Sequence, residues 1–247
     1  MYPSALLHNS LHGLPLNEVT LAEVLKAEGY RTGMVGKWHL GVGLNGEYLP
    51  TQQGFDTYLG IPYSHDMCPL VLGCYPGEVC DAPSPHRDTA SPCPLYRDMK
   101  IIEQPTDLTH LTEKLSDYSD QFILDSLHAD TPFFLFYSFY HVHFPQYSST
   151  TFRNSSLRGA FGDSVAEMDA AVGNLVDTLK EVGALDNTLI IFTSDNGPRS
   201  EPQGKQQGGN AGPFKCGKGT TWEGGLREDV KNIQRGRGSL VFRGTDQ

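Results

Sequence analysis

The first regular pattern of apolar and polar positions lies between residues 20 and 29. Its apolar residues recur at helical spacing: Leu21, Val24 and Leu25. Thr20 and Glu23 have the spacing of a capping box, in which each side chain accepts a hydrogen bond from the backbone N–H of the other residue. Gly29 follows as a C-terminal stop. The pattern predicts a short helix between Thr20 and Gly29.

Two longer helices and three strands follow from the same kind of pattern. Apolar residues recur at helical spacing over 111–127 and 161–182, whereas the short apolar runs 31–35, 133–139 and 189–193 are typical of buried strands. The alternating order of helices and strands predicts an α/β fold with a mostly parallel sheet and helices on both faces. In such sheets, ligands bind beyond the carboxyl ends of the strands.

Two segments show no regular spacing. Residues 41–105 are rich in Gly, Pro and Cys, so we expect them to be mostly loop. Residues 230–247 contain several glycines and arginines and have no readable periodicity.

Length and charge narrow the class of protein. The 247 residues carry a formal net charge of −10, which argues against binding nucleic acid through bulk charge. The most apolar stretch, 132–140, is far too short to cross a bilayer, so we expect no transmembrane segment. Residues 1–17 contain no Lys or Arg, and we expect no signal peptide in this chain.

Four cysteines crowd into one loop: Cys68, Cys74, Cys80 and Cys93. Their wide, irregular gaps disfavour a metal cluster, and we expect two local disulfides rather than free thiols. The spacing does not choose among the three pairings that four cysteines allow, although we prefer Cys68 with Cys93 around Cys74 with Cys80. Asn154 begins an Asn-Ser-Ser glycosylation sequon, which agrees with a secretory setting.

Reactive side chains follow each predicted strand. Asp195 and Asn196 come directly after the third strand, and a carboxylate beside a carboxamide suits Ca²⁺ or Mg²⁺. Two ligands are too few for either ion, and Asp-Asn-Gly is also an ordinary turn. The metal site therefore needs further ligands from elsewhere.

Two pairs of basic residues follow the other strands. His141 and His143 have the spacing that puts both side chains on one side of an extended segment. Zinc binding stays open, but no acidic or Cys ligand is nearby in sequence, which favours a general-acid or packing role. Lys37 and His39 have the same spacing and can equally be an exposed Lys and a packed His. Lys218 lies among glycines, but this segment lacks the Gly-x4-Gly-Lys-Ser/Thr order of a Walker phosphate loop. A lysine held by glycines can still place its positive charge beside an anion.

Five segments of the chain carry motifs that occur together in one family. They are residues 36–41, 60–66, 141–145, 192–198 and 216–225. In their order and residues they resemble the sulfatase family, and within it the arylsulfatases. The resemblance implies an alkaline-phosphatase-like α/β fold. It also implies Ca²⁺- or Mg²⁺-dependent hydrolysis of sulfate monoesters through a formylglycine made from a cysteine.

The resemblance also implies roles for individual residues. Asp195 and Asn196 would bind the metal ion, and sulfate would be contacted by Lys37, Ser64 and Lys218. His39 would hydrogen-bond the hydroxyl of the nucleophile, and His143 would protonate the leaving oxygen. The substrate would be a small-molecule, lipid or glycan sulfate ester, and the protein would be lysosomal or secreted. Homo-oligomerisation is left open.

The chain departs from the family pattern in several places. No Cys/Ser-x-Pro-x-Arg segment, the family's nucleophile motif, precedes residues 36–41, and no adjacent Asp-Asp pair occurs. We therefore expect a partial catalytic domain over 1–228 with a Cys-rich loop at 66–95, and a divergent tail over 229–247. We expect no normal turnover by this chain, an unpaired edge at the centre of its sheet, and no partner for Cys216.

Two other functions stay open at this point. One is a catalytically inactive protein that keeps an anion pocket, for which the missing nucleophile argues. The other is a phosphatase or phosphodiesterase of the same superfold, which would want more metal-binding His and Asp residues.

Overall fold

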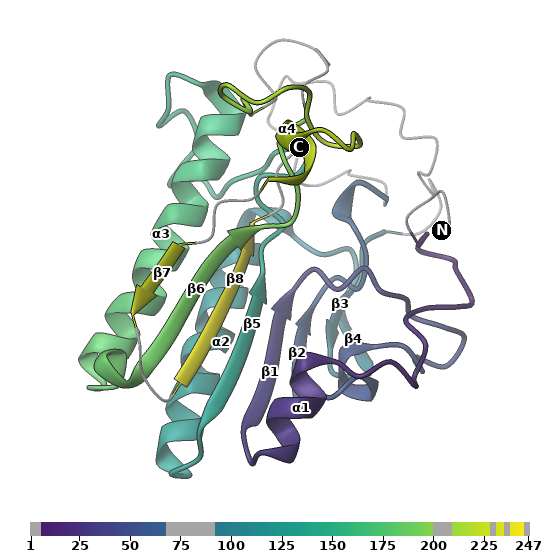
Figure 1. Ribbon diagram of the computed structural model, residues 1–247, viewed down its shortest axis with the longest axis vertical. Helices are drawn as coiled ribbons and strands as arrows, with labels where there is room; N and C mark the ends of the chain where they lie inside the picture. Colours follow the sequence, from purple (N-terminus) through teal and green to yellow (C-terminus); the bar gives the residue numbers. More distant parts are fainter. Residues whose placement is uncertain (1–5, 68–91, 200–208, 228–230, 235–237, 245–247) are drawn as a thin grey trace.

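The computed structural model describes residues 6–67, 92–199, 209–227, 231–234 and 238–244. These residues form a sheet in the order β4-β3-β2-β1-β5-β8-β6-β7 (Figure 1). Five neighbouring strands are parallel: β2 (Thr57–Gly60), β1 (Arg31–Gly36), β5 (Phe133–Ser138), β8 (Gly238–Gly244) and β6 (Thr188–Ser194). Antiparallel pairs with β3 (Leu95–Arg97), β4 (Lys100–Glu103) and β7 (Lys231–Gln234) complete the two edges.

Helices cover both faces of the sheet, as predicted. The helices are α1 (Leu21–Ala27), α2 (Leu111–His128), α3 (Gly159–Glu181) and the short α4 (Glu223–Leu226). In Figure 1, α2 lies behind the sheet and α1 lies in front of it. Short 3-10 turns lie at Pro50–Gln52, His65–Met67, Leu108–His110 and Leu185–Asn187. The α/β class with a mostly parallel sheet is therefore confirmed.

The alternation of side chains along the strands divides the core in two. On one face, Val35, Leu59 and Leu135 pack with residues of α2 and α3 such as Leu115 and Leu175. The residue directly before each of these strand residues points to the other face. These residues, Met34, Tyr58 and Phe134, pack with Ala22 of α1. Successive strand residues point to opposite faces, so continuous apolar runs are what a sheet covered on both sides requires.

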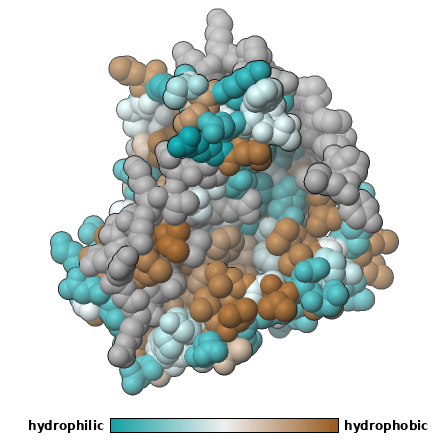
Figure 2. Space-filling view, in the orientation of Figure 1, coloured by the Kyte–Doolittle hydropathy of each residue, from teal (hydrophilic) through white to brown (hydrophobic). Residues whose placement is uncertain are grey.

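The capping box at the start of α1 is confirmed. The Thr20 hydroxyl accepts a hydrogen bond from the Glu23 N–H at 3.1 Å, and the Glu23 carboxylate accepts one from the Thr20 N–H at 2.8 Å. Only one residue of the predicted apolar face, Leu25, packs against the core, however. Leu21 and Val24 are exposed, and Ala22 faces the core instead. Figure 2 shows apolar surface around the position of α1.

The described residues among 41–105 are mostly loop, as expected, but they also include three short strands that the sequence did not predict. Strands β2, β3 and β4 lie within this stretch. Each has only three or four residues, which is too short for a two-residue alternation to stand out from neighbouring glycines and prolines. Pairing with β1 orders β2, and β2 in turn orders β3.

The expectation of an unpaired edge at the centre of the sheet is also wrong. Strand β8, from the tail over 229–247, lies between β5 and β6 and is parallel to both. Val241 is in register with Phe136 on one side and with Ile191 on the other. Backbone hydrogen bonds form such a ladder without any period in the side chains, which is why the tail showed no signal. Among the described residues, no helix is long and apolar enough to cross a membrane.

We predict that Val241→Pro destabilises the fold by about 1–3 kcal/mol, because proline lacks the N–H that a central strand needs and leaves a buried carbonyl without its donor. Val241→Thr is the matched control, since it keeps the N–H and a β-branched side chain. Urea unfolding followed by circular dichroism measures both variants. Equal stability of the two would contradict a central position for β8.

Candidate sulfate-binding site

The carboxyl ends of β1, β2 and β5 lie so close together that two positions, Gly36 and Gly60, have no room for a side chain. A Cβ on Gly36 would lie 1.9 Å from the Ser138 carbonyl oxygen, and Gly36 also has a φ of +96°. A Cβ on Gly60 would lie 2.0 Å from the Gly36 carbonyl oxygen. Directly after this contact, the Lys37 N–H donates to the Ser138 carbonyl at 2.9 Å. The His39 N–H donates to Pro62 at 3.0 Å. Glycine at both positions thus brings Lys37 and His39 to this edge of the sheet.

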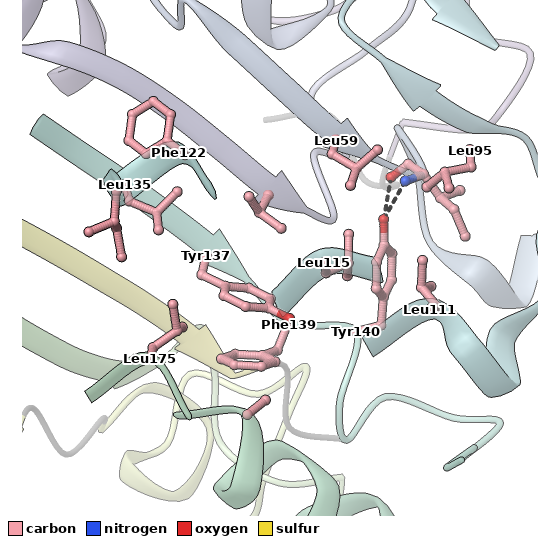
Figure 3. Packing of buried hydrophobic residues seen from close by; sticks show 14 of the residues in the cluster. Leu59, Leu95, Leu111, Leu115, Phe122, Leu135, Tyr137, Phe139, Tyr140 and Leu175 are labelled. Atoms are coloured by element: carbon pink, nitrogen blue, oxygen red, sulfur yellow. Dashed lines mark hydrogen bonds between the residues drawn. The ribbon is translucent and has the colours of Figure 1, made fainter. Parts of the chain in front are cut away.

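The loop that carries Ser64 is held by a buried tyrosine. The Tyr140 hydroxyl donates to the Ile61 carbonyl at 2.9 Å and accepts a hydrogen bond from the Ile61 N–H (Figure 3). Ser64 follows three residues later and is only 2% exposed. No described group hydrogen-bonds its Oγ. A buried hydroxyl without a partner is costly, so Ser64 is suited to donate to a ligand.

His65 is a site residue that the sequence reasoning missed. Its ring is fully buried, and Nε2 lies 3.0 Å from the Pro145 carbonyl oxygen. The ring centroid lies 5.8 Å from that of His143 and 5.5 Å from that of Tyr147, in edge-to-face arrangements. The only available signal was its place in Ser-His-Asp at 64–66, inside a motif segment.

Buried histidines share this region with two lysines. Burial and, after it, the positive charge of Lys37 lower the pKa of His39 to about 4. Burial likewise lowers the pKa of His65 to about 4, and the pKa of His143 well below its ordinary value. Lys37 and Lys218 both act on His39 and His143. Four predicted site residues therefore share one electrostatic environment, in which the imidazoles are neutral at pH 7.

The turn after β6 packs against the loop that carries Lys218. The Lys218 N–H donates to the Pro198 carbonyl at 2.8 Å, and the Gly197 N–H donates to Gly225 at 3.2 Å. A Cβ on Gly197 would lie 1.8 Å from the Gly224 carbonyl oxygen, so only glycine permits this contact. Lys218 is therefore fixed to the carboxyl end of β6.

Asp195 and Asn196 lie on that same turn. The Asn196 amide nitrogen donates to the Gly197 carbonyl at 3.0 Å. A carboxylate and an amide oxygen are the right donor types for Ca²⁺ or Mg²⁺. In the described part of the chain, no group of three or more His, Cys, Asp or Glu residues could hold an ion. The two residues are suited to a metal site but do not complete one.

The two histidines after β5 diverge. His143 lies beside His65, with its Nδ1 2.7 Å from the Phe144 carbonyl oxygen. His141 instead has its Nε2 3.3 Å from a carboxylate oxygen of Glu167. This arrangement gives no support to a shared zinc site.

The sequon and the cysteines have separate surroundings. Asn154 is exposed in the loop before α3, and its N–H donates to the Asp163 carboxylate at 2.8 Å. Cys93 is disulfide-bonded, while Cys216 is exposed and free. The other cysteines, Cys68, Cys74 and Cys80, lie outside the described residues, so the preferred pairing stays a prediction.

Two cavities among the described residues lie elsewhere. One, of about 350 Å³, is bounded by Pro132, Val182 and Thr188 near the amino ends of β5 and β6. The other, of about 620 Å³, is bounded by Arg31, Arg97 and α2. Neither is lined by a predicted site residue.

Comparison with known proteins establishes the family. The sulfatase family matches residues 1–230, and the chain belongs to it. Arylsulfatase A of Homo sapiens is 48% identical over 92% of the chain, and arylsulfatase G of Canis lupus familiaris is 41% identical over 88%. These matches cover 45% and 44% of the two relatives, so the chain spans about half the length of the curated relatives it matches.

Solved structures agree on the fold. The PsFucS1 sulfatase from Pseudoalteromonas sp. superposes with a TM-score of 0.76 at 30% identity, over 96% of this chain and 49% of that one. The resemblance that the motifs indicated is confirmed. The fold is part of the alkaline-phosphatase-like fold of the sulfatases.

We predict that the free energy of unfolding decreases as the pH falls from about 6.5 towards 4. His39, His65 and His143 have lowered pKa values in the folded state, so the unfolded chain binds more protons in this range. Each histidine contributes up to about 1.4 kcal/mol per pH unit. Added sulfate should reduce the loss, because an anion offsets Lys37 and Lys218 and raises these pKa values.

Urea unfolding at pH 7 and pH 5 measures this effect, with sodium chloride at equal ionic strength as the control for sulfate. Carboxyl groups whose pKa is lowered change the stability only below about pH 4.5, which is outside the range between pH 7 and pH 5. A stability that is constant or rises on acidification would contradict neutral, buried histidines.

Proposed function

We propose that this site binds the sulfate group of a sulfate monoester, and that the complete protein hydrolyses the ester as an arylsulfatase. The observation that carries the proposal is the convergence of Lys37, Lys218 and three neutral histidines at one edge of the sheet. Two positive charges near buried polar groups suit an anion. Membership of the sulfatase family supports sulfate rather than phosphate as that anion.

The residues divide the work according to their chemistry. Lys37 and Lys218 offset the negative charge of the sulfate oxygens, and Ser64 donates its hydroxyl hydrogen. A bound sulfate ester opposes the two lysines, and so raises the pKa of His143 from its lowered value. The protonated ring then gives its proton to the leaving oxygen as the bond from sulfur to oxygen breaks.

The chemistry of the nucleophile lies outside these residues. The family's formylglycine motif is absent before residues 36–41, and His39 is the residue proposed to hydrogen-bond that nucleophile. We therefore propose that this chain by itself binds sulfate without turning over its esters. A catalytically inactive anion-binding protein is the alternative that the same site supports.

A metal ion would supply further positive charge at the sulfate oxygens. We propose that Asp195 and Asn196 contribute part of a Ca²⁺ or Mg²⁺ site. No step above depends on this ion.

The setting of the protein is proposed from its modification sites. The exposed sequon at Asn154 and the disulfide at Cys93 support a lysosomal or secreted protein. The substrate we propose is a small aryl, lipid or glycan sulfate ester.

We predict that Lys218→Ala weakens the binding of inorganic sulfate at least tenfold, because a charge-assisted contact is worth about 1.5–3 kcal/mol. Lys180→Ala is the matched control, since this exposed lysine in the last turn of α3 lies away from the site. Titration calorimetry measures both. Equal affinity in the two variants would refute sulfate binding at Lys218.

The same proteins are then assayed with an aryl sulfate and added Ca²⁺. We expect no hydrolysis above background from the unmodified chain. Hydrolysis that Lys218→Ala abolishes would overturn the proposed lack of turnover and show that the chain is itself an enzyme.

We predict that the chain binds Ca²⁺ only in the millimolar range or not at all, because a calcium site uses about six to eight oxygen ligands. Any binding should disappear in Asp195→Asn and persist in Asp177→Asn, which removes an exposed carboxylate of α3. Calorimetry gives the affinities. Micromolar binding would contradict an incomplete site, and binding unaffected by Asp195→Asn would place the ion elsewhere.

A further inference from the structure

A carboxylate on α3 is buried outside the proposed sulfate site. Glu167 is only 3% exposed, on the buried face of α3 that continues with Ala171, Leu175 and Leu179. Burying a carboxylate is costly unless charged or hydrogen-bonding groups surround it. Its contacts therefore indicate what the residue does.

Glu167 contacts both ends of one loop. One carboxylate oxygen lies 3.3 Å from Nε2 of His141, at the start of the loop. The other accepts a hydrogen bond from the N–H of Ser149, eight residues later. Burial alone would raise the pKa of the Glu167 carboxyl, but His141, the Thr112 hydroxyl and the Ser149 N–H together outweigh it and the pKa is lowered. The carboxylate is thus ionised between these two contacts.

The segment between the contacts carries His143. Its interior is packed as well, because the His141 ring lies 4.6 Å from the ring of Tyr147, which is only 2% exposed. Nε2 of His65 lies 3.0 Å from the Pro145 carbonyl oxygen and fixes the middle of the loop. Glu167 therefore contacts both ends of this loop. The other contacts described here are the packing of His141 on Tyr147 within the loop and the contact of the site residue His65 with Pro145.

We propose that Glu167 is a positioning residue, which holds the 141–149 loop at both ends and so places the His143 imidazole beside Lys37 and Lys218. It contacts neither the sulfate nor the reacting atoms. A role of Glu167 in hydrolysis rests on the proposed function. Its role in positioning His143 does not depend on that function.

The charged and titratable groups around Glu167 come from several elements. His141 is the basic group that acts on its carboxyl. Tyr137 of β5 and Tyr147 of the loop face it too, and burial followed by the Glu167 charge raises the pKa of Tyr147. These phenols stay neutral over the accessible pH range, so the His141 ring and the Ser149 N–H are the groups that hold the two ends of the loop to the carboxylate.

The test compares Glu167→Gln with Glu181→Gln in the 247-residue chain, using NMR. Glu181 is the last residue of α3 and is exposed, so it controls for loss of one charge on the same helix. In Glu167→Gln we expect the Ser149 amide to exchange with solvent at least tenfold faster, while amides of β5 keep their protection. The pKa of His143 should move up towards 6.5 as its ring becomes more hydrated.

A His143 ring signal and pKa identical to the unmodified chain would overturn the proposal, even if Ser149 exchanged faster, because Glu167 would then be merely structural. Glu167→Asp is the second variant, should Glu167→Gln not fold. It keeps the charge on a shorter side chain, and we expect the same direction of change with a smaller size. Neither readout needs sulfate, so failure of this proposal and failure of the sulfate proposal are distinguishable.

Discussion

The close approach of three backbones at the carboxyl edge of the sheet is the constraint on which the site depends. Gly36 lies against the Ser138 carbonyl and Gly60 lies against the Gly36 carbonyl, at distances that exclude any Cβ. Lys37 follows this contact directly and Ser64 follows it within one loop. A larger residue at either glycine would separate β1 from its neighbours, and with it the lysine from the serine. The two glycines therefore determine both the close packing of the strands and the position of the Lys37 charge.

The electrostatics of the site follow from this crowding. Lys37 and Lys218 act on the imidazoles of His39 and His143, which burial has already made difficult to protonate, and at His39 the Asp66 carboxylate offsets the two lysines only in part. An environment of this kind is unfavourable to a further proton and favourable to an anion. An anion bound here would offset the lysine charges, and the same histidines would then be easier to protonate. The acidic net charge of the chain does not prevent anion binding, since surface charges more than about 10 Å from the site are largely screened by salt.

Much of the fold could be predicted from the sequence, because its signals are local. The capping box of Thr20 and Glu23 forms both of its hydrogen bonds, and the apolar runs became β1, β5 and β6. The sulfatase motifs likewise brought together Lys37, His39, His143 and Lys218. Strand β2 escaped prediction because four residues show no period. Strand β8 escaped because a ladder between β5 and β6 is a property of the backbone, not of side-chain order.

The residues that sequence reasoning missed in the site have partners far along the chain. His65 acquires its environment from Tyr140, His143 and Tyr147, which no spacing around residue 65 reveals. Glu167 did leave a signal, since it lies four residues before Ala171 and eight before Leu175, on the stripe of α3 that faces the core. An acidic residue on a buried stripe needs a polar partner, because burying a carboxylate alone is costly. Only the fold could name His141 and Ser149 as that partner.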